Sequence, residues 1–461
     1  MSIRGPLGAT PQSGAIGFKP TVIETRTTVS GVRLGLVGII GLLVCGLVIS
    51  VSAANTDPFL PESARPIPVG LAGPFGGAGI SIGYGGAIAV MALMVVCYAL
   101  AVRGAGELSP RVVFGTIAAL NALVLLAPPL LSTDVFSYQF YGRIGAIYGG
   151  NPYLAGPHGF ALDPLYPYIG ANWAYVPSAY GPLFTALSYP LAALGIAASD
   201  LAYKAIATLA SLVLVSAVWN AARLRGLDPV KAAVLVGLNP LLLVYGVGGG
   251  HNDLLMMAVL AVGVLALLQR RGHASGACIV AAAGIKLTAG LVLPFAIAGA
   301  AAAGTRAGGR RRDILLGAGV AAAVVAAISF ALFGTGPLHL IATLQKTQAS
   351  GDWYSFPGFV AAQLGFGHVG RVAGIGLTAI LVAVTVWLLR RVLRGELDWI
   401  TAAAWATLAM LLTASSLLPW YVAWLLPLAA LSADRRLVTA AVALTVVVQG
   451  MHLIGYLSHW L

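Results

Sequence analysis

Asp134 stands directly after the apolar run 112–131, at the position where a membrane would give way to water. Partial burial there would raise the pKa of its carboxyl group toward neutrality, which suits a general base. Ser132, Thr133 and Asp134 are also residue types that favour the N-terminal cap of a helix. The position therefore predicts a catalytic base, a helix cap, or one side chain that serves as both.

Aromatic residues and one cation follow in the same segment. Tyr138 and Tyr141 bring aromatic faces that could bind a sugar ring, and Arg143 could bind a phosphate group. Arginine suits that purpose because its planar guanidinium group binds phosphate in a bidentate manner. Tyrosines are also frequent at membrane interfaces as simple anchors, so the aromatic residues alone prove little.

The glycine-rich stretch GVGGGHNDLLM, at 246–256, brings three polar side chains together at His251, Asn252 and Asp253. A metal site needs more, because only His and Asp are good ligands here and no HxxxH or HxxE spacing supplies others. We therefore expect no metal. Hydrogen bonding to a sugar or structural capping is the better interpretation.

Lys286 lies in the middle of the apolar stretch AAAGIKLTAGLVLPF, at 281–295. A lysine buried in a membrane is costly unless it is paired or solvated, which makes it a functional hypothesis by default. Helix ends that meet inside a membrane can also direct N–H groups at an anion. The alternative is a side chain that extends to the lipid headgroups, and the distance of Lys286 from both ends of the segment argues against it.

Two later stretches carry further candidates for substrate contact. In LQKTQASGDWYSFPGF, at 344–359, the residues that could bind phosphate or sugar are Lys346, Gln348, Asp352, Trp353 and Tyr354, although a solvated loop uses similar residue types. In SSLLPWYVAW, at 415–424, Pro419 breaks a helix pair, and Trp420, Tyr421 and Trp424 lie at its apex. Anchoring at the membrane interface fits these three aromatic residues equally well.

The elements that must position these residues are membrane helices. The 461 residues are 59% hydrophobic and 9% charged, far below the roughly 25% charge of soluble domains. Residues 1–31 are rich in Gly, Pro and Thr and are predicted to be a disordered cytoplasmic segment. Residues 32–458 are predicted to form a single all-α transmembrane catalytic domain. Its apolar spans are expected at 32–53, 83–102, 112–131, 200–222, 232–247, 254–269, 313–333, 369–390, 399–414, 417–432 and 437–458.

Charge predicts how these spans are threaded. If 181–198 lies in the interface and 276–303 forms a pair of short helices with its apex at Lys286, nearly all Lys and Arg fall on the cytoplasmic side. The exceptions are Arg65, Arg143, Lys204, Lys286, Lys346 and Arg371. This threading predicts about 13 spans, a cytoplasmic N-terminus and an extracytoplasmic C-terminus. It also predicts long outer loops at 132–180 and 334–368, rich in the aromatic and polar residues that binding sites use.

The composition also limits the possible partners. The net charge of +12 lies in short basic clusters between apolar spans, so we expect a membrane and no nucleic acid. Cys45, Cys97 and Cys278 all fall within apolar segments and are interpreted as packing residues. The sequence has neither a Walker loop nor a dinucleotide fingerprint. A transferase that faces outward would therefore need a donor carried in the membrane, such as a polyprenyl phosphate ester.

Five stretches, in order, carry a family resemblance: TDVFSYQFYGR with GGNPY, AYGPLFTALSYP, NPLLLVYGVGGGHNDLLM, GIKLTAGLVLPF and LLPWYVAWLLPL. Over about residues 110–435 the chain resembles the polyprenyl-phosphomannose-dependent α-1,6-mannosyltransferases of actinobacterial lipoglycan synthesis, members of the glycosyltransferase C superfamily. The resemblance implies an inner-membrane enzyme of that fold. It implies an inverting transfer of mannose from a polyprenyl phosphate to a lipoglycan or glycolipid hydroxyl on the outer face.

The resemblance also implies that Asp134 is the general base. The superfamily often has a pair of acidic residues in this loop, whereas here a single Asp precedes Val-Phe-Ser, so a divalent metal and other cofactors are not expected. Lys286, Lys346 and Arg143 are the candidates for stabilising the phosphate. They are inferred from their positive charge and their predicted position on the outer side of the membrane, and not from a match to a family motif. Two alternatives stay open: a related enzyme with another donor, such as polyprenyl-phosphoarabinose, and a flippase or transporter for a lipid-linked sugar.

Overall fold

The computed structural model describes residues 29–55, 57–302, 307–349, 354–366 and 369–457, and over these residues it contains helices and no strands. The predicted all-α class is confirmed. The predicted disordered segment 1–31 lies almost wholly outside the described residues, which begin with the first residue of α1. The helices are α1 (Val29–Ala53), α2 (Tyr84–Gly104), α3 (Pro110–Leu126), α4 (Asp134–Ala146), α5 (Pro182–Leu191), α6 (Ile196–Leu224), α7 (Pro229–Gly237), α8 (Asn252–Leu268), α9 (Gly272–Ile285), α10 (Val292–Ala302), α11 (Ala307–Phe333), α12 (Leu340–Ala349), α13 (Phe356–Gln363), α14 (Arg371–Leu393), α15 (Trp399–Thr413), α16 (Val422–Ala430) and α17 (Arg435–Leu457).

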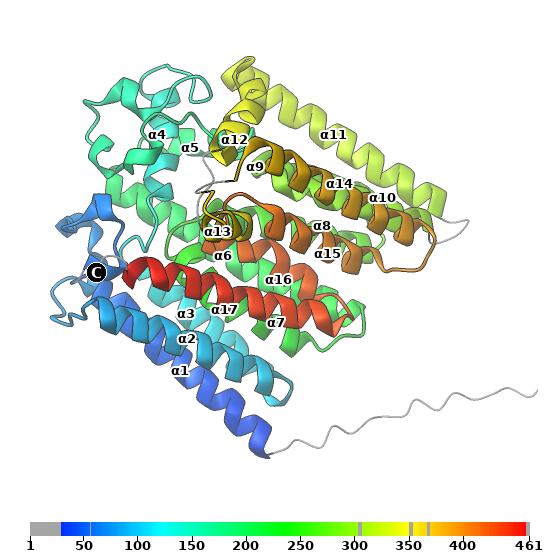
Figure 1. Ribbon diagram of the computed structural model, residues 1–461, viewed down its shortest axis with the longest axis horizontal. Helices are drawn as coiled ribbons and strands as arrows, with labels where there is room; N and C mark the ends of the chain where they lie inside the picture. Colours follow the sequence, from blue (N-terminus) through cyan, green and yellow to red (C-terminus); the bar gives the residue numbers. More distant parts are fainter. Residues whose placement is uncertain (1–28, 56, 303–306, 350–353, 367–368, 458–461) are drawn as a thin grey trace, which may run out of the picture.

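Most long helices run side by side along the molecule (Figure 1). Among the described residues, six segments are long and apolar enough to cross a membrane: Gly31–Ala53, Tyr84–Glu107, Ile196–Leu224, Arg310–Phe333, Arg371–Leu393 and Arg435–Ile454. Shorter apolar helices such as α3, α8 and α15 accompany them. The chain is thus consistent with a membrane helical protein, and the count of about 13 spans stays a prediction.

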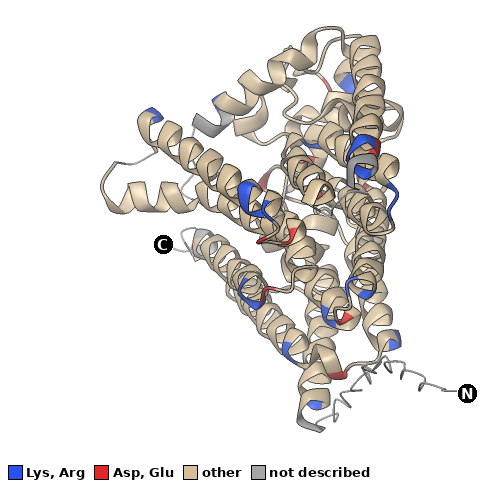
Figure 2. Ribbon diagram, turned by 90° about the vertical axis from the view of Figure 1, so that its right-hand side faces the viewer, with Lys and Arg blue, Asp and Glu red and all other residues tan. Residues whose placement is uncertain are grey.

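Loops that were predicted to share the cytoplasmic side meet at one end of the bundle. The connection after α6 contacts the connection before α15, where Arg225 Nη2 lies 2.8 Å from Asp398 Oδ2. Trp405 Nε1 on α15 donates to Asp434, just before α17, at 3.2 Å. Figure 2 looks onto this end and shows Lys and Arg at several helix ends and loops. The grouping agrees with the predicted division of the loops, and its orientation in a cell stays a prediction.

The predicted break at Lys286 is confirmed. Helix α9 ends at Ile285, Lys286 is extended with φ −150° and ψ 123°, and a short 3-10 helix, η10 (Leu287–Leu291), leads into α10. Helix α5 has 10 residues, fewer than the roughly 20 that a span needs. This length agrees with the prediction that 181–198 does not cross the membrane by itself.

Two predicted spans are interrupted: the break at Pro419 agrees with the prediction made from that proline, whereas the break at Asn239 was not predicted. In 232–247, Pro240 lacks an N–H group and Asn239 Oδ1 accepts from Leu241 N at 3.0 Å, so α7 stops and a π-helix, η9 (Leu242–Val247), follows. In 417–432, Pro419 begins a 3-10 turn, η12 (Pro419–Tyr421), before the nine residues of α16. Both irregular segments border the candidate site, where continuous helices would not present the same side chains.

Candidate active site

Asp134 is the first residue of α4. Pro128 and Pro129 follow the end of α3, and the buried ammonium of Lys204 donates to the carbonyls of Ala127 and Pro128, which fixes this turn. The N-cap of α4 is Thr133, so the carboxylate of Asp134 is not the N-cap group. It lies at the positive end of the helix dipole, which favours its ionised form.

Side chains from three segments surround the Asp134 carboxylate. Its Oδ2 atom accepts from the Tyr180 hydroxyl at 3.2 Å and from the Tyr138 hydroxyl at 3.4 Å, and His251 Nδ1 lies 3.5 Å away. Only 12% of the side chain is exposed. Burial raises the pKa of the Asp134 carboxyl to about 6, against the opposing effects of the Lys286 charge and the two tyrosine hydrogen bonds. The predicted basic group therefore has the environment that the sequence suggested.

The glycine turn at 248–250 brings His251 to this carboxylate. Gly250 has φ +66°, a conformation that favours glycine, and the Gly248 carbonyl accepts from Leu130 N at 3.0 Å. His251 is fully buried, and its ring stacks on Trp420 with a centroid distance of 3.6 Å. Within the described part of the chain, His251 Nε2 and Asn252 Nδ2 are buried without a hydrogen-bond partner. Such atoms favour a ligand that supplies hydroxyl groups.

The partner of Lys286 is Asp253. Lys286 Nζ lies 2.8 and 2.9 Å from the two Asp253 carboxylate oxygens, and Trp424 Nε1 donates to Asp253 Oδ1 at 2.6 Å. The Asp253 side chain is fully buried, whereas 14% of the Lys286 side chain is exposed. The pair satisfies the rule that a buried charge needs a partner.

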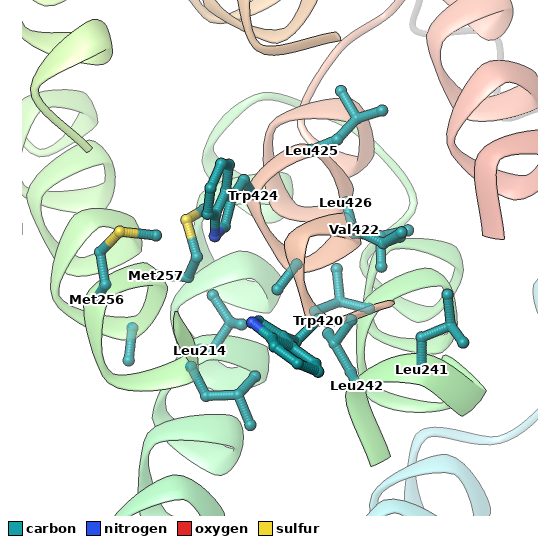
Figure 3. Close-up of a cluster of buried hydrophobic side chains, with 14 of the residues drawn as sticks. Leu214, Leu241, Leu242, Met256, Met257, Trp420, Val422, Trp424, Leu425 and Leu426 are labelled. Carbon is teal, nitrogen blue, oxygen red and sulfur yellow. The ribbon is translucent and has the colours of Figure 1, made fainter. Parts of the chain in front are cut away.

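Aromatic rings cover this ion pair. Lys286 Nζ lies 4.8 Å from the centroid of Tyr421 and 5.2 Å from that of Trp424, close enough for cation–π attraction. Tyr421 and Trp424 stack at 4.2 Å. Figure 3 shows Trp420 and Trp424 projecting from the η12–α16 segment among apolar side chains, including Met257 of α8 and Leu242 of η9. The turn at Pro419 thus brings Trp420, Tyr421 and Trp424, the three aromatic residues expected at this apex, to the site.

A turn before α5, at Tyr180 and Gly181, lies between the Asp134 carboxylate and the segment whose Lys286 holds Asp253. Gly181 N donates to the Ile285 carbonyl at 2.9 Å, and a β-carbon at Gly181 would lie 2.2 Å from the Gly284 carbonyl oxygen, so only glycine fits. The preceding Tyr180 reaches Asp134, while Ile285 immediately precedes Lys286. The candidate residues from the sequence did not include Tyr180, although its AYGP motif contributed to the resemblance.

Tyr141 and Arg143 lie on α4 but make other contacts. The Tyr141 hydroxyl donates to the Val176 carbonyl at 2.9 Å, and Arg143 Nε forms an ion pair with Asp163 Oδ2 at 2.8 Å. The hydroxyl of Tyr148 also donates to Asp163. Burial alone would raise the pKa of Asp163, but the bonds from Tyr148, the Leu165 backbone and Arg143 hold it below its usual value. The Arg143 and Tyr148 contacts fold the segment around α4 and do not join the cluster at Asp134. The Tyr141 ring does border the cluster, since it lies 6.1 Å from the Tyr180 ring between centroids.

The remaining candidates belong to the second predicted outer loop, 334–368. Lys346 lies exposed on α12, and Tyr354 stacks on His452 of α17 with a centroid distance of 4.6 Å. Asp352 and Trp353 lie outside the described residues, and the side chain of Gln348 does too. Over the described ranges, no group of three or more His, Cys, Asp or Glu side chains is placed to hold a metal ion.

Comparison with known proteins decides the family. The family model "Alpha-(1->6)-mannopyranosyltransferase, N-terminal domain" matches residues 32–302, and the model "MptB C-terminal domain" matches residues 356–453. The chain belongs to this mannopyranosyltransferase family. The resemblance seen in the sequence is confirmed at the level of the family, and all the clustered residues outside η12 and α16 fall within the first match.

Curated members of the mannopyranosyltransferase family align over much of the chain. Alpha-(1->6)-mannopyranosyltransferase A of Mycobacterium tuberculosis is 29% identical, and a probable alpha-(1->6)-mannopyranosyltransferase of Mycolicibacterium smegmatis is 30% identical. Each alignment covers 70% of this chain and 66% of the relative, so the chain spans just under two thirds of their length. An alpha-(1->6)-mannopyranosyltransferase A of Corynebacterium glutamicum is 28% identical over 40% of this chain and 37% of its own length. No solved structure matches the chain.

Proposed function

We propose that this chain is a glycosyltransferase that moves mannose from a polyprenyl-phosphate donor to a hydroxyl group of a lipoglycan or glycolipid acceptor. The observation that carries the proposal is the convergence of residues from five separate segments around two carboxylates, Asp134 and Asp253. Among the described residues, no Lys or Arg is bonded to Asp134, whereas Asp253 holds Lys286. The names of the relatives support mannose as the sugar.

The reaction that fits this site is a single inverting displacement. The acceptor oxygen attacks the anomeric carbon of mannose while the bond from that carbon to the phosphate oxygen breaks. The acceptor proton passes to the Asp134 carboxylate, and the electron pair of the broken bond leaves with the polyprenyl phosphate. A base whose pKa is close to neutrality suits this step, because it is ionised before the reaction and still basic enough to take the proton.

Lys286 is the best placed of the three candidate cations for stabilising the departing phosphate. An ammonium group has three N–H donors, and two of them serve the Asp253 oxygens, which leaves one for a phosphate oxygen. Arg143 is already bound to Asp163, and Lys346 lies on a different helix from the cluster. We therefore assign the phosphate to Lys286, and the unpaired atoms of His251 and Asn252 to sugar hydroxyl groups.

The sidedness of the site is part of the proposal. Asp134, Lys286 and Trp420 belong to segments that the charge pattern assigns to the extracytoplasmic side, whereas Arg225 and Asp398, which contact each other, belong to loops that it assigns to the cytoplasmic side. A donor anchored in the same membrane can reach such a site without a nucleotide. We propose a plasma-membrane protein with membrane lipid around it and with the donor and acceptor as its partners.

The decisive experiment measures transfer of labelled mannose by the purified full-length protein in lipid vesicles. Polyprenyl-phosphomannose is the donor, polyprenyl-phosphoarabinose is the competing donor, and a mannosylated glycolipid is the acceptor. The proposal predicts a new mannosyl linkage with an inverted anomeric configuration. Transfer only from the arabinose donor favours the related enzyme, and movement of intact donor across the vesicle membrane without a new linkage favours a flippase.

We expect the rate to depend on pH through Asp134. Only the ionised carboxylate accepts the acceptor proton, and burial raises the pKa of Asp134 to about 6. The transfer rate should therefore fall as the pH drops through about 6, by about tenfold per pH unit below it. A profile of kcat against pH checks this, with the folded fraction measured at each pH. A rate that stays constant down to the usual carboxyl range would contradict the assignment.

We also expect that a chelator leaves the rate unchanged. Both Asp253 oxygens face the Lys286 ammonium, which competes with a divalent cation for the same lone pairs. Among the described residues, Asp134 and His251 are then the two adjacent side chains that could still bind a metal ion, and two ligands are fewer than a metal site uses. Initial rates measured before and after dialysis against EDTA, with added Mg²⁺ or Mn²⁺ as the reverse control, test the expectation. A loss of rate that a divalent cation restores would overturn it.

A further inference from the structure

The two oxygens of the Asp134 carboxylate have different surroundings. Tyr180 and Tyr138 both donate to Oδ2, and His251 Nδ1 also lies on that side. No hydrogen bond reaches Oδ1 from any residue that the structure describes. We infer that Tyr180 is a positioning residue that holds Asp134 by Oδ2 and leaves Oδ1 to receive the acceptor proton. The inference rests on the proposed function and assigns a role to a residue outside the candidate set.

Tyr180 is held firmly enough for this role. It is 8% exposed, and its ring packs edge-on against Tyr138 with a centroid distance of 4.8 Å and an interplanar angle of 86°. Its carbonyl accepts from the Tyr153 hydroxyl at 2.9 Å, and the next residue, Gly181, bonds to Ile285. Because the phenol has little freedom, it costs little entropy to keep the carboxylate in one orientation.

The same turn connects the base to the cation. Gly181 has no room for a β-carbon against the Gly284 carbonyl, so the backbone of the turn lies directly on the residues that precede Lys286. Tyr180 therefore fixes the position of Asp134 relative to the segment that carries Lys286, the lysine proposed to bind the phosphate. A displacement needs the base and the leaving group on opposite sides of one carbon. Two described segments bond to both sides of the site: this turn, and 251–253, where His251 faces Asp134 and Asp253 holds Lys286.

The charge of Asp134 depends on several facing groups. They are Tyr138 and Tyr141 on α4, Tyr180 on the turn before α5, His251 and Asp253 at the N-terminal end of α8, Lys286 at the α9 break and Tyr421 on η12. A hydrogen bond to an ionised carboxylate favours that form, so the Tyr180 bond lowers the pKa of Asp134. Removing this hydroxyl should raise that pKa, an effect that a purely structural residue would not produce.

The test is the pH profile of the Tyr180→Phe variant of the full-length protein, with polyprenyl-phosphomannose as donor. We expect the acidic limb of kcat to move to higher pH by about 1 unit, since a hydrogen bond to a charged group has roughly this effect. We expect kcat on the plateau to fall by roughly tenfold while the donor KM stays within about twofold. An acidic limb and a plateau both equal to those of the wild type would overturn the inference.

Tyr153→Phe is the matched control. This variant also loses one buried phenol that bonds to the same turn, through the Tyr180 carbonyl, but it removes no bond to a carboxylate. Its acidic limb should coincide with that of the wild type, whatever its effect on stability. If both variants shift the limb equally, the effect comes from the fold of the turn and the inference is wrong.

A second measurement keeps the test decisive if Tyr180→Phe folds poorly. In the Asp134→Asn variant, a residue that acts only by positioning the Asp134 carboxylate has little effect on the rate, because that carboxylate is gone. Adding Tyr180→Phe should therefore lower the residual rate per folded molecule by less than about twofold. A full tenfold further loss would show an independent role and overturn the inference. Failure of the proposed function is distinguishable, because the wild type itself would then transfer no mannose.

Discussion

Replacing Asp134 with asparagine is expected to lower mannosyl transfer by about 10²–10⁴-fold, the usual effect of losing a general base. The asparagine keeps the volume and can still accept from Tyr180 and Tyr138, but it cannot take a proton at neutral pH. Burial raises the pKa of the Asp134 carboxyl, so the ionised form is unfavourable in the folded protein. The variant should therefore unfold at the same temperature as the wild type or at a higher one.

Asp163→Asn is the control for this prediction. Asp163 lies in the same predicted outer loop but accepts from Arg143 and Tyr148, and its pKa is lowered, so its ionised form stabilises the fold at neutral pH. The control should unfold at a lower temperature and keep its kcat per folded molecule. The two variants thus have opposite signatures when kcat and unfolding temperature are measured together. An Asp134→Asn protein with ordinary turnover would refute the assignment of the base.

Hydropathy in the sequence predicts where the helices lie, because each membrane-sized apolar run has one favourable conformation. Charge predicts which loops share an end of the bundle, as the contact between Arg225 and Asp398 illustrates. Local hydropathy does not predict the π-helix after Asn239 or the 3-10 turn at Pro419, although the proline itself predicted a break there. Those depend on individual prolines and on side chains that satisfy the freed backbone groups, such as Asn239 Oδ1.

The sequence predicted those residues of the candidate site whose charge is unusual for the segment in which they lie. Lys286 and Asp134 stand out because a charge in an apolar setting is costly wherever its partner lies. Their partners are far away in sequence: Trp424 reaches Asp253 from 171 positions downstream. Arg143 shows the same limit. The sequence indicates its charge and its predicted side of the membrane, but it does not indicate the bond to Asp163 that makes Arg143 unsuitable as the phosphate ligand.

Tyr180 was missed for a related reason. It is one of 16 tyrosines, many of them in segments where tyrosine is common as an interfacial anchor. What distinguishes it is the glycine that follows, which lets the backbone lie against Gly284 and aims the phenol at Asp134. A tyrosine directly before Gly-Pro in an outer segment is therefore the local pattern to look for, but only the long-range contact gives it meaning.

The second large effect is expected at the buried ion pair. Lys286→Met leaves the fully buried Asp253 carboxylate with the Trp424 indole as its remaining bonded donor, and breaking a buried pair from one side typically costs about 3–5 kcal/mol of stability. The same variant removes the cation proposed to bind the leaving phosphate. We expect a lower unfolding temperature together with a loss of kcat of at least about 10²-fold.

A second substitution separates these two effects. Lys286→Met combined with Asp253→Asn removes both charges, and the asparagine oxygen can still accept from Trp424, so most of the lost stability should return. The phosphate would still have no cation, so kcat should stay low. Recovery of the unfolding temperature without recovery of the rate assigns Lys286 to the chemistry. If stability and kcat recovered together, the lysine would serve only to neutralise Asp253, and the leaving phosphate would have to be stabilised by another group.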